Sequence, residues 1–99
     1  MAQNSQKELF RQFLEEGLSE GVAGNGKVKN NQYIHYFTPI CERYENKIIF
    51  NHTRYSLATG QLQKMMKQAI PQDRIIEVGG VPEGYKGSLT DFIKAGDKV

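Results

Sequence analysis

The chain has 99 residues, of which 38% are hydrophobic, and a formal net charge of +2. A chain of this length can bury one modest core, so we expect residues 1–99 to form a single small domain. Its one cysteine, Cys41, excludes an internal disulfide, and the sequence has neither an apolar run of signal-peptide length nor one of membrane-spanning length. These features favour a cytoplasmic location and predict no contact with a membrane.

The positive charge is concentrated in the middle of the chain. Residues 25–75 contain eight lysines and arginines against three acidic residues, whereas both flanks are acidic. Such an excess attracts polyanions, although lysines that merely solvate an exposed surface give the same pattern.

The first predicted element is a helix over residues 5–17. Ser5 and Glu8 have the spacing of a capping box, and Gly17 is typical of a helix C-terminus. The apolar residues of this segment fall on one helical face: Leu9, Phe10, Phe13 and Leu14. Residues 17–31 hold four glycines and three asparagines, which favours a flexible linker and a loosely docked first helix.

Residues 32–78 are predicted to form the core of the domain. Alternation over 33–38 indicates a strand, and Pro39 requires a bend, a bulge or a sheet edge. A second strand is expected over 40–44 and a third over 47–51, joined by a tight turn at Glu45 and Asn46.

The best-supported helix follows this hairpin, capped by Ser56 or Thr59 and ended by Pro71. Its apolar stripe is one that would cover a sheet: Leu62, Met65, Met66, Ala69 and Ile70. Residues 74–78 read as another strand, and residues 79–99 as a loop with a short terminal helix from Ser88 to Gly96. The sequence thus predicts an α+β fold with a three- to four-stranded, mainly antiparallel sheet packed by one main helix.

Two sequence patterns suggest ligand chemistry that their context does not support. Residues 21–27 match the letters G-x-x-x-x-G-K, but Val28 replaces the hydroxyl residue and a helix precedes the glycines where a P-loop has a strand. Cys41, His35 and His52 lack the close pairing of zinc ligands. We therefore expect no cofactor and no metal site.

One catalytic hypothesis uses the two histidines. His35 and His52 would act as general acid and base in metal-independent RNA cleavage, with Lys47 or Arg54 stabilising charge on a phosphate.

The alternative that we favour is non-catalytic binding by a basic, tyrosine-containing side of the hairpin. Cations and tyrosines placed together can contact a phosphate backbone and stack on bases, although tyrosines at sheet edges often pack with only their hydroxyls in water. The candidate binding residues are Arg43, Tyr44, Lys47, Arg54, Tyr55, Lys64 and Lys67.

A short motif in the same region resembles small uncharacterised proteins of phage and mobile-element type. The matching residues are Tyr36, Thr38, Ile40, Asn51, Tyr55, Ser56 and Thr59. Ala58 departs from the pattern, where a second threonine is commoner, and Gln63 stands near a position that is often histidine. The resemblance implies a regulatory or host-interaction accessory protein and brings no established activity.

The sequence therefore predicts a small binding or regulatory protein with a macromolecular partner, either protein or nucleic acid. The alternatives are the two-histidine ribonuclease and a structural or oligomeric component. For the last of these, the strand over residues 47–51 would join two copies edge to edge.

Overall fold

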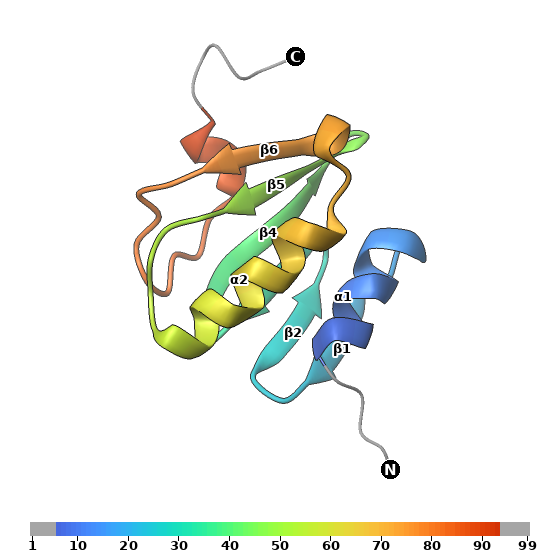
Figure 1. Ribbon diagram of the computed structural model, residues 1–99, viewed down its shortest axis with the longest axis horizontal. Coiled ribbons are helices and arrows are strands. Elements are labelled where there is room, and N and C mark those ends of the chain that lie inside the picture. The colour runs from blue at the N-terminus through green and yellow to red at the C-terminus, as the bar shows by residue number, and fades with distance from the viewer. Residues whose placement is uncertain (1–5, 94–99) are drawn as a thin grey trace.

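The computed structural model describes residues 6–93, in which one six-stranded sheet carries two α-helices on the same face (Figure 1). In chain order the elements are α1 (Gln6–Glu15), β1 (Glu20–Ala23), β2 (Gly26–Lys29), β3 (Gln32–His35), β4 (Thr38–Tyr44), β5 (Lys47–Asn51), α2 (Leu57–Ala69), the 3-10 helix η1 (Gln72–Arg74), β6 (Ile75–Val78) and the 3-10 helix η2 (Leu89–Phe92).

The strands lie in the sheet in the order in which the chain makes them. β1 to β5 form an antiparallel meander, and β6 pairs in parallel with β5 after the chain crosses over through α2. The predicted α+β class is confirmed. The sheet has six strands where three or four were expected, because two of them come from the predicted linker.

The prediction of a flexible linker over residues 17–31 is wrong. Glu20–Ala23 and Gly26–Lys29 pair as an antiparallel hairpin, and β2 pairs in turn with β3. The G-x-x-x-x-G-K letters therefore lie on two strands and their turn, and not on a strand-loop-helix unit.

The glycines of this hairpin mark close packing rather than flexibility. A Cβ on Gly21 would lie 2.8 Å from Leu9 Cδ1, and one on Gly26 would overlap the hydroxyl of Tyr33. A larger residue at Gly21 or Gly26 would require side chains of Leu9, Leu18, Gln6 or Tyr33 to shift. Helix α1 is consequently docked firmly, with Leu9, Phe10 and Phe13 all buried, against the expectation of loose docking.

The first predicted strand is also divided differently. β3 ends at His35, and the chain reverses through Tyr36 and Phe37, which have φ angles of 51° and 67°. Period-two alternation continues through both residues, so it gave no sign of this turn. The irregularity expected at Pro39 is confirmed, since the β3–β4 register shifts there and leaves Ile40 as an extra residue.

Helix α2 agrees with its prediction. Ser56 is the N-cap, and its side chain accepts a hydrogen bond from the Thr59 amide. Leu62, Met66 and Ile70 are buried against the sheet, while Ala69 of the predicted stripe is exposed. The helix ends before Pro71, as expected.

The two faces of the sheet are covered to different extents. Alternate β5 residues divide between them, because Ile48 and Phe50 pack under the helices and Ile49 packs on the opposite face. There the chain beyond β6 returns over the strands and contributes Val81 and Leu89 to a second core. The predicted terminal helix is the single 3-10 turn η2, capped by Ser88, and the stop expected at Gly96 falls outside the described residues, as does the Ser5 cap.

The expectation that residues 47–51 form an exposed strand is wrong. β5 pairs with β4 on one side and with β6 on the other, so its backbone groups are occupied within the sheet. Within residues 6–93, β1 and β6 are the edge strands.

Candidate functional site

Arg43, the first predicted binding residue, is a structural clamp. Its guanidinium donates hydrogen bonds to the carbonyl oxygens of Phe13, Leu18 and Asn30 at 2.6, 2.7 and 3.0 Å. It also lies over the Phe13 ring, 4.3 Å from the centroid, and burial lowers its pKa. The side chain thus joins α1, the connection between α1 and β1, and the β2–β3 turn to strand β4.

The other predicted binding residues do not converge on one surface. Tyr44 packs in the second core, on the face away from α2, and Lys47 donates to the carbonyl of Asp73. Arg54 and Tyr55 follow the opposite end of β5, and the Tyr55 hydroxyl is bonded to Asn51 and Val81. Lys64 and Lys67 are exposed on α2, where Lys67 lies 3.4 Å from Glu77.

The two histidines occupy different surroundings. His35 is only 3% exposed, and its Nδ1 lies 3.1 Å from Thr59 Oγ1. Burial lowers the pKa of His35, which favours the neutral imidazole. His52 is exposed just past β5, where its ring lies against Gly79. None of the cavities described below is lined by both histidines.

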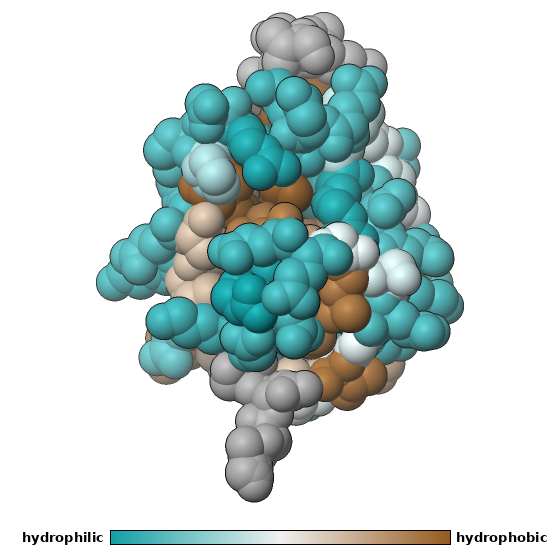
Figure 2. Space-filling model, turned by 90° about the vertical axis from the view of Figure 1, so that its right-hand side faces the viewer, coloured by the Kyte–Doolittle hydropathy of each residue, from teal (hydrophilic) through white to brown (hydrophobic). Residues whose placement is uncertain are grey.

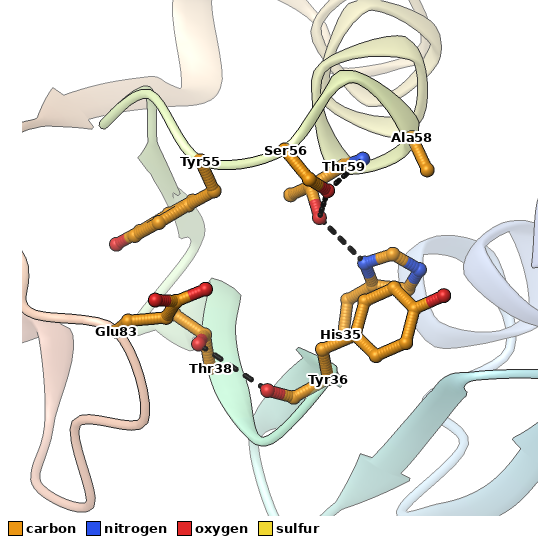
Figure 3. Close-up of a pocket in the computed structure, with 8 residues that line it drawn as sticks. All are labelled: His35, Tyr36, Thr38, Tyr55, Ser56, Ala58, Thr59 and Glu83. Carbon is orange, nitrogen blue, oxygen red and sulfur yellow. Dashed lines mark hydrogen bonds between the residues drawn. The ribbon is translucent and has the colours of Figure 1, made fainter.

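A pocket of about 430 Å³ opens at the N-terminus of α2 (Figure 3). Its lining comes from the β3–β4 turn, the start of α2 and the returning chain: His35, Tyr36, Thr38, Tyr55, Ser56, Ala58, Thr59 and Glu83. Five of the seven residues that carry the motif resemblance are in this set. The motif therefore corresponds to one place in the structure rather than to scattered positions.

The hydroxyl network of the pocket has two separate parts, one around the helix cap and one at Thr38. Ser56 Oγ accepts from the Thr59 amide and donates to Thr59 Oγ1, which in turn contacts His35 Nδ1. Thr38 Oγ1 accepts from the Gly84 amide and donates to the Tyr36 carbonyl. These bonds hold the pocket walls in a single arrangement.

Two buried residues, Asn51 and Gln63, hold the segments that line the pocket. The Asn51 amide donates to the carbonyl of Pro39 and to the Tyr55 hydroxyl, both at 3.0 Å. The side chain of Gln63, which is buried on α2, donates to the carbonyls of Asn51 and Thr53. In this chain, Gln63 therefore has a structural role.

The β3–β4 turn beside the pocket has an unusual conformation and composition. Two consecutive positive φ angles are typical of a type I′ turn, which favours asparagine and glycine, yet here the residues are Tyr36 and Phe37. Such backbone conformations cost of the order of 1–3 kcal/mol per residue and cluster at functional sites. Phe37 is 80% exposed, and Tyr36 packs against His35 while its hydroxyl accepts from Asn25.

Over strands β1 to β3, no helix or strand of residues 6–93 covers the sheet face opposite α1. Its outward residues form cross-strand rows, with Val22, Lys27 and Ile34 aligned in one and Glu20, Lys29 and Gln32 in the next. The returning chain stops at the border of this region, where Gln32 donates to Glu42 and to the carbonyl of Gly87. We call this surface, together with Phe37, Tyr85 and Lys86, the open face.

The open face contains two shallow hollows that share a border. One, of about 220 Å³, is lined in part by Val22, Tyr36 and Phe37, and the other, of about 330 Å³, in part by Lys29, Tyr85 and Lys86. Both are also lined by Lys27, Ile34 and Phe37. The side of the molecule with α1 and β1 is mostly hydrophilic, with hydrophobic residues showing between the polar ones (Figure 2).

The charge of the open face is positive. Lys27, Lys29 and Lys86 are exposed, and none of them has an ion pair with another residue of the described range 6–93. Glu20 is the one acidic residue in the cross-strand rows. Tyr85 is fixed by a hydrogen bond to Asp91, which raises its pKa, and by an edge contact with Phe92.

Sequence reasoning missed this face because it assigned Lys27 and Lys29 to a linker. A usable signal was present, since Lys27, Val28 and Lys29 alternate polar and apolar residues, as a half-buried strand does. The four glycines and three asparagines of residues 17–31 outweighed this signal.

No family model, curated protein or solved structure matches this chain. Over the described part of the chain, neither helix has the length and apolar character needed to span a membrane. No cluster of three or more histidine, cysteine or acidic side chains suited to a metal ion occurs among these same residues.

Proposed function

We propose that this protein is a small, non-catalytic accessory protein that binds single-stranded nucleic acid along the open face. In keeping with the motif resemblance, it would act as a phage or mobile-element factor in the cytoplasm. The observation that carries the proposal is the set of three unpaired lysines, Lys27, Lys29 and Lys86, around exposed aromatic and aliphatic side chains of the sheet.

Charge and apolar character together favour a nucleic acid over a protein partner. The centre of a protein interface is usually depleted of lysine, whereas here Lys27 lies between Val22 and Ile34 in a cross-strand row. A nucleic acid satisfies both features, because its phosphates pair with the lysines and its bases pack on the apolar surface.

Exposed aromatic rings favour a single strand over a duplex. In a duplex the base faces are stacked on one another and unavailable to side chains, whereas a single strand presents them to aromatic platforms. Phe37, which is 80% exposed, is the stacking side chain of the open face, and the half-buried Tyr85 lies at its border.

The test is fluorescence anisotropy with labelled oligo(dT) and oligo(U) of about 12 nucleotides, a length within the range that one small domain covers. We expect binding at low salt that weakens as salt rises, with a log–log slope of about −2 if three phosphates are neutralised. The variant Lys27→Gln/Lys29→Gln/Lys86→Gln should lose both the affinity and the slope. Phe37→Ala should lose about 1–3 kcal/mol of binding free energy without changing the slope.

A matched variant removes the same charge from the helix side of the molecule. Arg54→Gln/Lys64→Gln/Lys67→Gln changes three of the residues predicted from sequence and should leave binding nearly unchanged. Equal losses in the two triple variants would show that net charge alone drives binding, and no binding at low salt would refute the proposal.

Gel analysis of the incubated oligo(U) separates binding from cleavage. Degradation of the oligo(U) that His35→Gln and His52→Gln each abolish would favour the ribonuclease hypothesis instead.

A further inference from the structure

We propose that the pocket at the N-terminus of α2 receives one base of the bound strand and selects bases that carry an amino group, guanine above the others. This inference rests on the proposed function, because it assigns to that pocket a part of the same ligand. It names a base-specific contact that the open face by itself lacks.

The pocket and the open face meet at the β3–β4 turn. Tyr36 lines the pocket and also the smaller hollow of the open face, while the next residue, Phe37, lines both hollows. A strand that stacks on Phe37 is therefore one residue away from the pocket entrance. The base next to the one stacked on Phe37 would therefore reach the pocket by passing over the β3–β4 turn.

The pocket has the size and the aromatic walls that a base needs. Its volume of about 430 Å³ falls within the 300–1,000 Å³ range that is typical of small-molecule sites. Tyr36 and Tyr55 supply aromatic surface, and both are held in place, Tyr36 by His35 and Asn25 and Tyr55 by Asn51. A site held in this way loses little entropy when a ligand enters.

The carboxylate of Glu83 determines which edge of a base is accepted. Glu83 faces the pocket opposite the hydroxyl network, and within residues 6–93 its carboxylate makes no hydrogen bond or ion pair (Figure 3). A carboxylate only accepts hydrogen bonds. Guanine offers two adjacent N–H groups on one edge and fits the carboxylate best, whereas adenine and cytosine offer one amino group. Thymine and uracil offer a single N3–H that lies between two carbonyl oxygens, and the carboxylate repels those oxygens.

The same carboxylate argues against a phosphate in this pocket. A helix N-terminus attracts anions, and Ser56 and Thr59 lie at the first turn of α2. However, no lysine or arginine lines the pocket, and Glu83 adds a negative charge. The base of a nucleotide, and not its phosphate, is therefore the part that fits.

The experiment compares oligo(dT) with oligo(dT) that carries one central dG, measured with the wild-type protein and with Glu83→Gln. We expect the single dG to tighten wild-type binding about tenfold, as a bidentate contact to a base does. Replacing that dG with deoxyinosine, which lacks the amino group, should remove most of the gain. Glu83→Gln should bind oligo(dT) at least as well as the wild type but lose the preference, whereas Glu77→Gln, an exposed carboxylate outside the pocket, should keep it.

The outcomes separate this inference from the proposed function. Strand binding without a preference for dG, or a preference that survives Glu83→Gln, overturns the inference and leaves the open face in place. Absence of strand binding refutes the proposed function and, with it, a pocket that serves the strand. NMR titration with free guanosine gives a readout that does not require the open face. The amide signals of Thr59 and Gly84 should shift with guanosine but not with uridine. Amide signals that do not shift with guanosine would count against the pocket.

Discussion

The two halves of the sheet differ in how many of their faces are covered. Strands β4 to β6 are covered on one face by α2 and on the other by the returning chain, with Phe50 and Ile49 buried on opposite sides. Strands β1 to β3 are covered on one face by α1, with α2 reaching only His35 at the end of β3, and their outer face carries lysines and apolar side chains. The doubly covered half therefore has a buried core on each of its faces, whereas the singly covered half has a core on one face and leaves the other face uncovered by the described residues.

The largest expected effect tests this division directly. Ile49→Ala removes a fully buried side chain from the second core and should lower the free energy of unfolding by about 2–5 kcal/mol. Ile34→Ala makes the same kind of change on the open face and should cost less than about 1 kcal/mol, because Ile34 is only half-buried. Urea unfolding of both variants measures the difference. Equal losses would show that the open face is part of the core, and the division would then fail.

A smaller effect should follow from removing the clamp between the halves. Arg43→Met loses three hydrogen bonds from a charged donor to backbone carbonyls and should cost about 2–4 kcal/mol. Arg11 also has several charged partners, Glu8, Glu15 and Glu16, but its side chain is 41% exposed. Arg11→Met should therefore cost clearly less than Arg43→Met when both variants are compared by urea unfolding. A loss at Arg43 no greater than that at Arg11 would contradict the structural role given to the clamp.

The smallest expected effect is a pH dependence of the free energy of unfolding that comes from His35, which lies where β3 meets α2. Burial lowers the pKa of His35 in the folded state, so below about pH 6.5 the unfolded chain binds more protons than the folded one. The free energy of unfolding should therefore be highest above that pH and decrease as the pH falls towards the folded-state pKa. Urea unfolding at a series of pH values should show a weaker acid loss in His35→Gln than in the wild type. The exposed His52→Gln serves as the control and should keep the wild-type slope; a wild-type slope in His35→Gln would exclude His35 as the cause.

The doubly covered half was the part that sequence patterns predicted well, and the physical reason is visible in particular residues. Leu62, Met66 and Ile70 have helical spacing because they cover a sheet, and Pro39 coincides with a bulge because it lacks an N–H for the ladder. Patterns of this kind reflect local constraints, which can be read from neighbouring positions.

The singly covered half was predicted poorly because its constraints are not local. Gly21 and Gly26 read as flexible, yet they are required by side chains of α1 and β3 that come close only in the folded chain. Tyr36 and Phe37 form a turn against their own preferences because the flanking strands pair around them. The predicted binding residues were chosen by charge and type within the hairpin region, and such a choice could not show that Arg43 points at carbonyls or that Lys27 and Lys29 share a face with Lys86.

The Arg43 clamp has a consequence for how the molecule would report a ligand. Because one guanidinium joins α1, the connection between α1 and β1, and the β2–β3 turn to a strand of the other half, neither half can open without breaking the same three bonds. Melting should then occur as one cooperative transition. Anything that binds only the folded open face would raise the melting temperature of the whole domain, so a thermal-shift screen of oligonucleotides would detect its ligands without any label.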